Sequence, residues 1–505
     1  MATFHIEHFG CRATQADAAA IERQLLERGF LASRGAAQAD VVVVNTCTVT
    51  ASADTRARQA IRAIHRENPA ARIVVTGCYA QRAPEELAGL EGVVWVVGNS
   101  HKPEIPRLID HMAVQSSGWS IAEQSFASEG QEPRVSAGFV PLEQVDAASR
   151  GGIRDGNGAD PMSLARAPAK ILTGNIFEQS GVLVGPILGG EGGHTRPVLK
   201  IQDGCNNRCA YCVIPFVRGR SRSLPPAQVV EEIRRLSAAG YREVVLSGIN
   251  LGSYGRDLNP RVEFGELLRR VLEETSLERL RISSIEPMDV TQDLIALFAS
   301  TDRIAQHCHI PLQSGSDRIL AAMHRWYRSA HYARRVELIR ELLPNAGIGA
   351  DIIAGFPGET ETDHQATLAL IRELPLTYLH VFSFSKRPGT KAAEMSGEVP
   401  PEVIKRRSRE LHALAAERAA AFRAAQLGCT LRVLTLNRSS EGRFGEVSAV
   451  DGSMGHSTGA WTGALSSNYL DVRVAGSWPA NRILDVRVTA LNGSHLIGQA
   501  LDAIR

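Results

Sequence analysis

Three cysteines, Cys205, Cys209 and Cys212, stand close together in the segment GCNNRCAYC (residues 204–212). A Cys-x3-Cys-x2-Cys loop is short enough to wrap three thiolates around one iron–sulfur cluster. Three ligands on a four-iron cluster leave one iron with an open coordination position, which can bind and activate another molecule. A structural zinc site is the alternative, but it normally needs a fourth protein ligand. No His or Cys follows in the next several residues, so the segment predicts an open cluster.

Three further cysteines are far apart in the sequence but share one setting. Cys11, Cys47 and Cys78 each come just after a short apolar run, namely HIEHFG, VVVVNT and RIVVTG. If these runs are parallel strands, their carboxyl ends meet at one edge of a sheet, where open α/β folds bind ligands. Buried cysteines that pack as small apolar residues are the alternative. Because all three fall at the same edge, we expect a second cluster there, whereas Cys308 and Cys429 lack a partner at ligand spacing.

The elements around these cysteines indicate an α/β protein. In residues 1–114, short apolar strands alternate with helical stretches, which is typical of a doubly wound parallel sheet. Residues 115–193 lose this periodicity, and their Gly, Ser and Pro content predicts a low-complexity linker. Residues 194–424 hold six strand-like runs, each followed by a helical stretch, which predicts a partial parallel barrel. Alternating short strands in residues 425–505, after a helix near 401–426, predict a small β-barrel.

Composition limits the class of protein. The chain has 505 residues, of which 44% are apolar and 22% charged, so about three globular domains are expected. A formal net charge of only +2 means that any nucleic-acid partner must meet a local basic surface. No secretion signal and no run of about 18 apolar residues are present, so we expect a cytoplasmic protein without a membrane partner. Eight cysteines are too few for a disulfide framework.

The motifs together resemble a known family. An aromatic residue, Tyr211, precedes the last cysteine of GCNNRCAYC, as in the radical S-adenosylmethionine (SAM) superfamily. The segments NTCTVTASAD, VVTGCYAQ, LSGINLGSYGRDL, RISSIEP, HIPLQSGSDRIL and GADIIAGFPGET are similar to those of the methylthiotransferase family. This resemblance implies a methylthiotransferase domain, then a radical SAM barrel, then a small RNA-binding barrel called TRAM.

The resemblance also implies cofactors and a reaction. A 4Fe–4S cluster on Cys205, Cys209 and Cys212 would reduce SAM with an electron from a donor such as flavodoxin or ferredoxin. The resulting deoxyadenosyl radical would take a hydrogen from C2 of threonylcarbamoyladenosine beside the anticodon of tRNA. A second 4Fe–4S cluster on Cys11, Cys47 and Cys78 would carry the sulfur that is inserted. Isopentenyladenosine in tRNA and an aspartate of a ribosomal protein are alternative substrates, and a non-catalytic iron–sulfur RNA-binding protein is an alternative class.

By the same resemblance, polar residues and glycines at the strand ends would hold SAM, although each is also typical of an ordinary turn. These are Tyr211, Ser247, Gly248, Asn250, Ser283, Glu286, Gln313, Asp351 and Gly355. Three arginines that follow the cluster loop, Arg218, Arg220 and Arg222, are candidates for contact with RNA phosphate or a cofactor carboxylate. Solvated surface arginines are the alternative interpretation.

Overall fold

The computed structural model describes residues 2–117, 169–186, 195–443, 448–449 and 458–501. The chain divides into two compact units. Unit 1 comprises Met1–Gly185, Gly204–Asn206 and Cys212–Arg220, and unit 2 comprises Pro186–Asp203, Asn207–Tyr211 and Ser221–Arg505. No helix within the described ranges has both the length and the apolar character needed to cross a bilayer.

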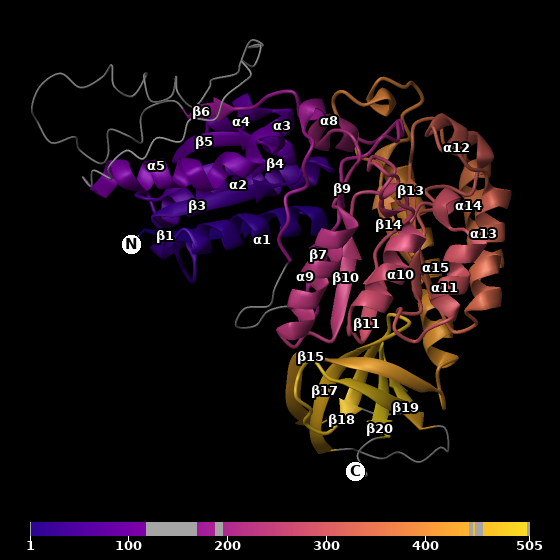
Figure 1. Cartoon of the computed structure of the whole chain (residues 1–505). Coiled ribbons are helices and arrows are strands. Elements are labelled where there is room, and N and C mark those ends of the chain that lie inside the picture. Colours follow the sequence, from indigo (N-terminus) through magenta and orange to yellow (C-terminus); the bar gives the residue numbers. More distant parts are fainter. Residues whose placement is uncertain (1, 118–168, 187–194, 444–447, 450–457, 502–505) are drawn as a thin grey trace, which may run out of the picture. The chain divides into compact units, whose positions relative to one another are not determined.

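Unit 1 is built on a six-stranded parallel sheet with the order β2-β1-β3-β4-β5-β6 (Figure 1). Its strands are β1 Thr3–His8, β2 Leu31–Ala32, β3 Val41–Thr46, β4 Arg72–Gly77, β5 Val93–Gly98 and β6 Lys170–Leu172. Its helices are α1 Arg12–Glu27, α2 Ala51–Glu67, α3 Cys78–Arg82, α4 Pro84–Ala88, α5 Ile105–Ser117 and α8 Ile214–Arg218. The short 3-10 helices η1 Ala36–Gln38, η2 Asn99–Glu104 and η3 Ile176–Glu178 complete it. The predicted doubly wound sheet is confirmed.

Side-chain alternation along the buried strands produces two cores, one on each face of this sheet. On one face, Val41 and Val43 of β3 pack in a cluster with Ile21 of α1 and Ile109 of α5. On the other face, the alternate residues of β3 pack in a cluster with Ile61 of α2 and with residues of α3 and α4. Helices on both faces explain why the strands read as nearly unbroken apolar runs.

Part of the predicted linker belongs to this sheet. Strand β6 pairs in parallel with β5, with Trp95 opposite Lys170 and Val97 opposite Leu172. A three-residue strand carries too weak a periodic signal to stand out in a polar stretch. Two further parts of the predicted linker, residues 118–168 and 187–193, lie outside the described residues.

Unit 2 begins with six parallel strands in two three-stranded sheets, β11-β10-β7 and β12-β13-β14. Their bounds are β7 Val198–Lys200, β10 Glu243–Ser247, β11 Arg279–Ile282, β12 His307–His309, β13 Gly347–Ala354 and β14 Tyr378–Ser383. Parallel bridges between Leu280 and Ile304 and between Ser284 and His309 join the two sheets into one curved sheet. This is the predicted partial (β/α)6 barrel.

Helices follow the strands of this barrel in turn. They are α9 Pro226–Ala238, α10 Phe264–Glu274, α11 Gln292–Ala299, α12 Asp317–Ala322, α13 Ser329–Leu342, α14 Glu361–Glu373 and α15 Pro401–Ala424. Short elements between them are β8 Gln202–Asp203, β9 Arg222–Ser223, η4 Leu251–Ser253, η5 Pro287–Asp289 and η6 Lys391–Ala393. Helix α15 matches the helix predicted near 401–426.

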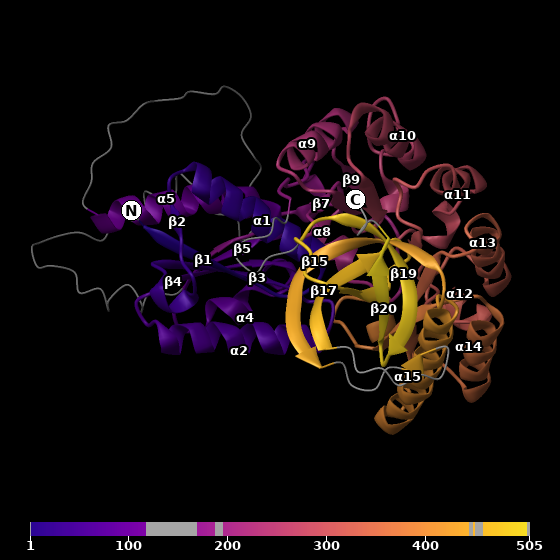
Figure 2. The same cartoon turned by 90° about the horizontal axis from the view of Figure 1, so that it is seen from below.

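The C-terminal strands form a small closed barrel, whose curved strands are visible in Figure 2. They are β15 Thr430–Arg443, β16 Ser448–Ala449, β17 Thr458–Ser466, β18 Asp471–Ala475, β19 Ile483–Asn492 and β20 His495–Ala500. Pairing of β15 with both β17 and β19 closes the barrel. Its interior is apolar, with Val433, Val474 and Val486 completely buried. The predicted small β-barrel is therefore confirmed.

A buried ionic network attaches this barrel to the central one. Glu243 is fully buried and accepts charge-assisted bonds from Arg279 and Arg281 of the neighbouring strand β11. The remaining guanidinium nitrogens of Arg281 donate to the backbone oxygens of Ser466 and Ser467, at 2.9 and 3.0 Å. Arg279 donates in the same way to backbone oxygens of β15 and β17. Arginine suits this position because its planar fork serves several acceptors at once.

Candidate functional site

The sheet of unit 1 brings three cysteines to one edge. Cys11 precedes α1 after β1, Cys47 follows β3, and Cys78 begins α3 after β4, and these three strands are adjacent in the sheet. Cys11 is exposed, whereas Cys47 and Cys78 are buried. Cys78 also packs against Val213 and Val217, which follow Cys212 in the chain. The predicted shared edge is therefore present.

Glycines allow the backbone to pass tightly at this edge. Gly10 has a φ of +105°, and a Cβ atom on it would lie 2.4 Å from Cβ of Cys47. Gly77 has a φ of +102°, and its Cβ atom would lie 2.2 Å from the backbone oxygen of Thr46. A side chain at either position would be both strained and obstructed. These glycines thus let the loops with Cys11, Cys47 and Cys78 approach one another.

The electrostatic setting of these thiols is unusual. Burial, together with the nearby Cys78 and Cys11, raises the pKa of Cys47 to about 12. A buried cationic group lies close by, in which Asp17 is 2.7 Å from Nζ of Lys102 and 2.9 Å from Nη2 of Arg218. Two cations and one carboxylate leave a net positive charge beside the cysteines. This positive charge favours thiolates: Arg218 lowers the pKa of Cys47, although burial and the two neighbouring cysteines outweigh it in the metal-free protein.

This donor set fits an iron–sulfur cluster. Cysteine thiolates are the usual ligands of such clusters, and three of them leave one iron open. Hydrogen-bond donors near the sulfurs are also typical, and Nδ2 of Asn99 lies 3.5 Å from Sγ of Cys78. Unit 1 therefore offers a three-cysteine site with a cationic surrounding.

The second cysteine set lies in the loop after β8. Gly204 opens this loop with a φ of +70°, and a Cβ atom on it would overlap the backbone oxygen of Arg220. The backbone N–H of Cys205 donates to the oxygen of Gly219 at 3.0 Å. Sγ of Cys209 lies 3.2 Å from Nη1 of Arg325, so a positive charge faces this sulfur. A thiolate is stabilised by such a neighbour.

Two predicted cofactor residues at the barrel strand ends carry polar atoms that the described protein leaves unsatisfied. Oδ1 of Asn250 and Oγ of Ser283 are both buried and have no hydrogen-bond partner among the described residues. Buried polar atoms are normally paired, so an unpaired one indicates a ligand or water that completes it. Ser247 and Gly248 lie at the carboxyl end of β10, just before Asn250, and Gly248 is tightly packed against Gln202. These atoms fit a polar cofactor such as SAM.

The backbone is specialised at two other predicted positions. Gln313 has a φ of +67°, which is uncommon for a residue with a side chain and is typical of functional sites. Gly355 has a φ of +81°, and a Cβ atom on it would lie 2.4 Å from the side chain of Ile404. Tyr211 contacts Phe356 edge to face, with ring centroids 6.5 Å apart. Gln313 thus follows β12, Gly355 follows β13, and Tyr211 lies against Phe356 just after β13.

Glu286 and Asp351 are also predicted residues, and both are held by basic partners. Burial raises the pKa of Glu286, although its ion pair with Arg325 opposes the change. Burial of Asp351 would raise its pKa, but hydrogen bonds from His309 and His380 outweigh it and lower the pKa to about 2. Asp351 is thus ionised at neutral pH.

The structure adds three residues that the sequence did not single out as functional. Arg325 joins Cys209 to Glu286, and no local motif signals this role. His309 and His380 contact Asp351, and one nitrogen of each ring lies within 4.8 Å of its carboxylate and of the other ring. His307 and His309 alternate along β12 and therefore share one face of that strand, a pattern that is equally typical of packing inside a barrel. The contact with His380 arises only when β12, β13 and β14 pair.

The three candidate arginines occupy different environments. Arg218 is 2% exposed and ion-paired with Asp17, which argues against a contact with RNA at this position. Arg222 is 8% exposed and lies on β9, which pairs with β8. Arg220 is exposed and stays a candidate for RNA contact.

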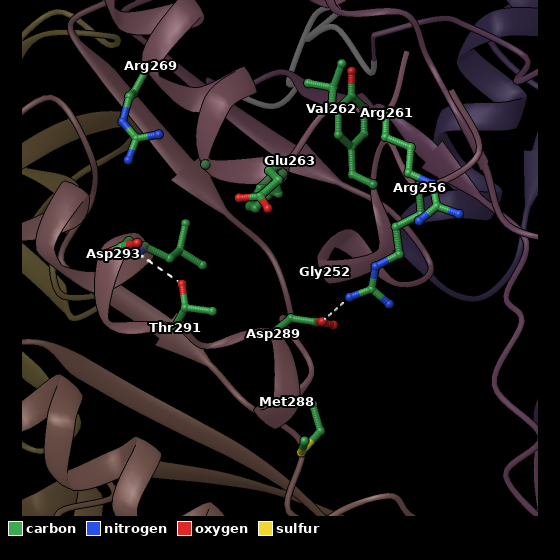
Figure 3. A pocket seen from close by; sticks show the side chains of 14 residues that line it. Gly252, Arg256, Arg261, Val262, Glu263, Arg269, Met288, Asp289, Thr291 and Asp293 are labelled. Carbon is green, nitrogen blue, oxygen red and sulfur yellow. Dashed lines mark hydrogen bonds and ion pairs between the residues drawn. The ribbon is translucent and has the colours of Figure 1, made fainter. Parts of the chain in front are cut away.

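A separate cavity of about 620 Å³ lies in unit 2 beside η4, η5 and α10 (Figure 3). Three arginines and three carboxylates are among its lining residues, and Arg256 pairs with Asp289 across it. Arg261 and Arg269 lie on opposite sides of the opening in this view. Its lining contains none of the cluster cysteines and none of the predicted cofactor residues. Its opposing charges give no net preference for an anion or a cation.

Comparison with known proteins decides the family. The radical SAM superfamily model matches residues 199–371, and a model described as uncharacterized protein family UPF0004 matches residues 3–98. The chain is 34% identical to threonylcarbamoyladenosine tRNA methylthiotransferase MtaB of Aquifex aeolicus over 86% of this chain and 92% of that protein. This chain belongs to the radical SAM methylthiotransferase family.

Other methylthiotransferases are nearly as similar. The tRNA-2-methylthio-N(6)-dimethylallyladenosine synthase of Carboxydothermus hydrogenoformans is 32% identical over 98% of each chain. Among solved structures, the radical SAM methyltransferase TsrM of Kitasatospora setae aligns with a TM-score of 0.47 and 18% identity, over 78% of this chain and 74% of that one. Members of the radical SAM superfamily use a 4Fe–4S cluster and SAM, and the enzymes of this family transfer a sulfur-containing group.

Proposed function

We propose that this protein adds a methylthio group to C2 of threonylcarbamoyladenosine beside the anticodon of tRNA. The observation that carries the proposal is its 34% identity to MtaB across 92% of that protein. Both cysteine sets support a methylthiotransferase, because their cysteines follow the ends of strands, where α/β folds bind ligands. The reaction would take place in the cytoplasm.

In this proposal, Cys205, Cys209 and Cys212 would hold a 4Fe–4S cluster at which SAM would bind. That group supplies one-electron cleavage of SAM, with the electron from a flavodoxin or ferredoxin. Arg325 stabilises the thiolate of Cys209 and fixes Glu286 by an ion pair. Asn250 and Ser283 supply the buried polar atoms that hold the cofactor's hydroxyl and amino groups. The protein thus orients the cofactor and excludes water from it.

Cys11, Cys47 and Cys78 would hold the second 4Fe–4S cluster, which supplies the sulfur. Lys102 and Arg218 place positive charge beside these ligands, with Asp17 holding both side chains in position. Three thiolates on a cluster give a net negative site, so the buried cations lower the cost of forming it in a poorly solvated place.

Dimethylallyladenosine is a second candidate substrate. It is favoured by one observation, the 32% identity to a dimethylallyladenosine-modifying relative along 98% of both chains. The two candidates share the purine and its C2 atom and differ in the group on N6. One group is polar and carries a carboxylate, and the other is a branched hydrocarbon.

Mass spectrometry of nucleosides from total tRNA distinguishes these candidates. A strain without the gene should lose 2-methylthio-threonylcarbamoyladenosine and accumulate the parent nucleoside, and the wild-type gene should restore it. Cys209→Ala should fail to restore it, whereas Cys429→Ala should succeed, because Cys429 lies outside both cysteine sets. Loss of the dimethylallyl product instead would establish the second candidate, and unchanged tRNA would contradict both.

A further inference from the structure

One face of the strands β12, β13 and β14 carries polar side chains, which are buried on β12 and exposed on β14. On β13, Ile348, Ala350 and Ile352 are buried, and Asp351 lies on the opposite face. Asp351 is directly opposite His380 in the register of β13 and β14. Side chains from three strands meet on this face, which identifies it as the inner, concave face of the partial barrel. Polar groups on it are available to a molecule that enters the barrel.

Asp351 contacts two histidines that differ in their exposure to solvent. Its Oδ1 atom lies 3.1 Å from Nε2 of His309 and 3.3 Å from Nδ1 of His380. The other ring nitrogen of His309 lies 2.7 Å from Oγ of Ser284, so this buried ring has protein atoms beside both nitrogens, and Nε2 makes no well-aligned hydrogen bond. Nε2 of His380 has no hydrogen-bond partner among the described residues, and its side chain is 52% exposed against 8% for His309. His380 is the member of the group that can bind something else.

The contact with Asp351 fixes what His380 can offer. The ionised carboxylate accepts a hydrogen bond from Nδ1–H, which sets the tautomer and the ring orientation. The outer nitrogen then accepts a hydrogen bond from a hydroxyl or an amide N–H, or donates to a carboxylate when the ring is protonated. A threonylcarbamoyl group has all three of these partners. A dimethylallyl group has none.

An exposed aromatic ring lies on the same face. Phe382 is 48% exposed and follows His380 by two positions on β14, toward the carboxyl end of the strand. Two strand residues span roughly 6.6 Å. Proteins that bind an unstacked base commonly stack it on an aromatic side chain. A purine on Phe382 could therefore extend its N6 group along the strand to His380.

We propose that His380, oriented by Asp351, recognises the polar N6 group of the modified adenine and so selects threonylcarbamoyladenosine over an adenine with an apolar N6 group. The inference rests on the proposed tRNA methylthiotransferase function. A site that hydrogen-bonds its substrate rejects an analogue that lacks the polar groups, because the bound analogue would remove the outer nitrogen of His380 from water and leave it unpaired. Asp351 acts as a positioning residue in this arrangement.

The test uses the reconstituted enzyme with two synthetic anticodon stem-loops, one with threonylcarbamoyladenosine and one with dimethylallyladenosine. The variants are His380→Phe, which removes both nitrogens but keeps a flat ring, and His380→Gln, which keeps a polar end. His331→Phe on the exposed surface of α13 is the control. Each is assayed for kcat and KM on both RNAs, and for SAM cleavage without RNA.

We expect His380→Phe to lower kcat/KM for the threonylcarbamoyl RNA by about 10- to 100-fold, mainly through KM. His380→Gln should recover part of this loss, and His331→Phe should show none. Equal activity of His380→Phe and wild type on the threonylcarbamoyl RNA would refute the role of His380 and leave the proposed function intact. A wild-type enzyme that uses only the dimethylallyl RNA would refute the proposed substrate itself.

Two other outcomes would overturn the inference. A loss of SAM cleavage without RNA in His380→Phe, in proportion to the loss with RNA, would assign His380 to the cofactor. In the second, a chelator would abolish activity, and Zn²⁺ or Mn²⁺ would restore it in the wild type but not in His380→Phe. That result would make His309, Asp351 and His380 a metal site.

Discussion

Nζ of Lys102 lies 2.7 Å from Oδ2 of Asp17, and both side chains are almost completely buried. Arg218 approaches the same carboxylate oxygen from the segment after Cys212, so one carboxylate holds two cations. Burial lowers the pKa of Lys102, while the attraction of Asp17 opposes that change. This group lies close to Cys47 and Cys78. We therefore expect Asp17 to affect both the stability of the fold and the binding of a cluster by these cysteines.

Replacing Asp17 tests this group. Asp17→Asn removes the carboxylate that Lys102 and Arg218 share, and breaking such a buried ion pair typically costs about 3–5 kcal/mol. Hydrogen exchange followed by mass spectrometry should show faster exchange in α1 and η2, which carry Asp17 and Lys102, and the iron content of the protein should fall. Arg107→Ala is the control, because Arg107 is 65% exposed in its pair with Glu104 and such pairs contribute at most about 1 kcal/mol. Equal exchange in the two variants would contradict the prediction.

The thiol of Cys47 should be slow to react in metal-free protein. With a pKa of about 12, it stays protonated near pH 8, and its thiolate fraction rises about tenfold per pH unit up to that pKa. We expect iodoacetamide to label exposed Cys11 first, and labelling of Cys47 to increase steeply from about pH 9 to 11. Peptide mass spectrometry measures both. The same protein in urea is the control, since Cys47 should then react like the other cysteines.

The same raised pKa has a consequence for stability. A folded-state pKa above the unfolded value means that the folded chain binds the proton more tightly, so stability is present below about pH 8.5 and is lost as the pH rises toward 12. Metal-free wild-type protein should therefore show a falling unfolding temperature above about pH 9. Cys47→Ala should show a smaller fall. A parallel decline in both proteins would rule out Cys47 as the cause.

Glu243 should anchor the C-terminal barrel. Glu243→Gln leaves Arg279 and Arg281 buried with one neutral partner, and we expect a loss of about 3–5 kcal/mol in the stability of this interface. Hydrogen exchange in β15 and β17 should accelerate, because both arginines donate to backbone oxygens in this part of the barrel. Glu278→Gln breaks an exposed pair with Arg242 nearby and should change exchange little. Protection that is unchanged in Glu243→Gln would argue against an anchoring role.

Asn250 and Ser283 should contribute to SAM affinity. Asn250→Ala and Ser283→Ala each remove one buried polar atom that has no hydrogen-bond partner in the described part of the chain, and each should weaken SAM binding by about 10-fold. Iron content should stay at the wild-type level, since neither residue is a cluster ligand. Equilibrium dialysis with labelled SAM measures the affinity, with Ser300→Ala at the exposed end of α11 as control. SAM affinity equal to wild type in both variants would show that these atoms face water.

The sequence alone predicted two sets of cysteine ligands and the succession of folds along the chain. Cys205, Cys209 and Cys212 are local in the chain, so their spacing is a sufficient signal, and strand periodicity predicted the parallel sheet, the six-stranded barrel and the small closed barrel. The edge shared by Cys11, Cys47 and Cys78 followed from a general property of parallel sheets. These features depend on local pattern and simple topology.

Tertiary structure decided the pairings between distant residues. The burial of Arg218 against Asp17, the bridge from Cys209 through Arg325 to Glu286, and the contact of Asp351 with His380 each join segments far apart in the chain. Strand β6 also joined the sheet of unit 1 from a stretch with no periodic pattern. Side-chain charge and hydrogen-bonding capacity are properties of a sequence. The partner that satisfies each group is set by strand register and packing, which exist only once the chain has folded.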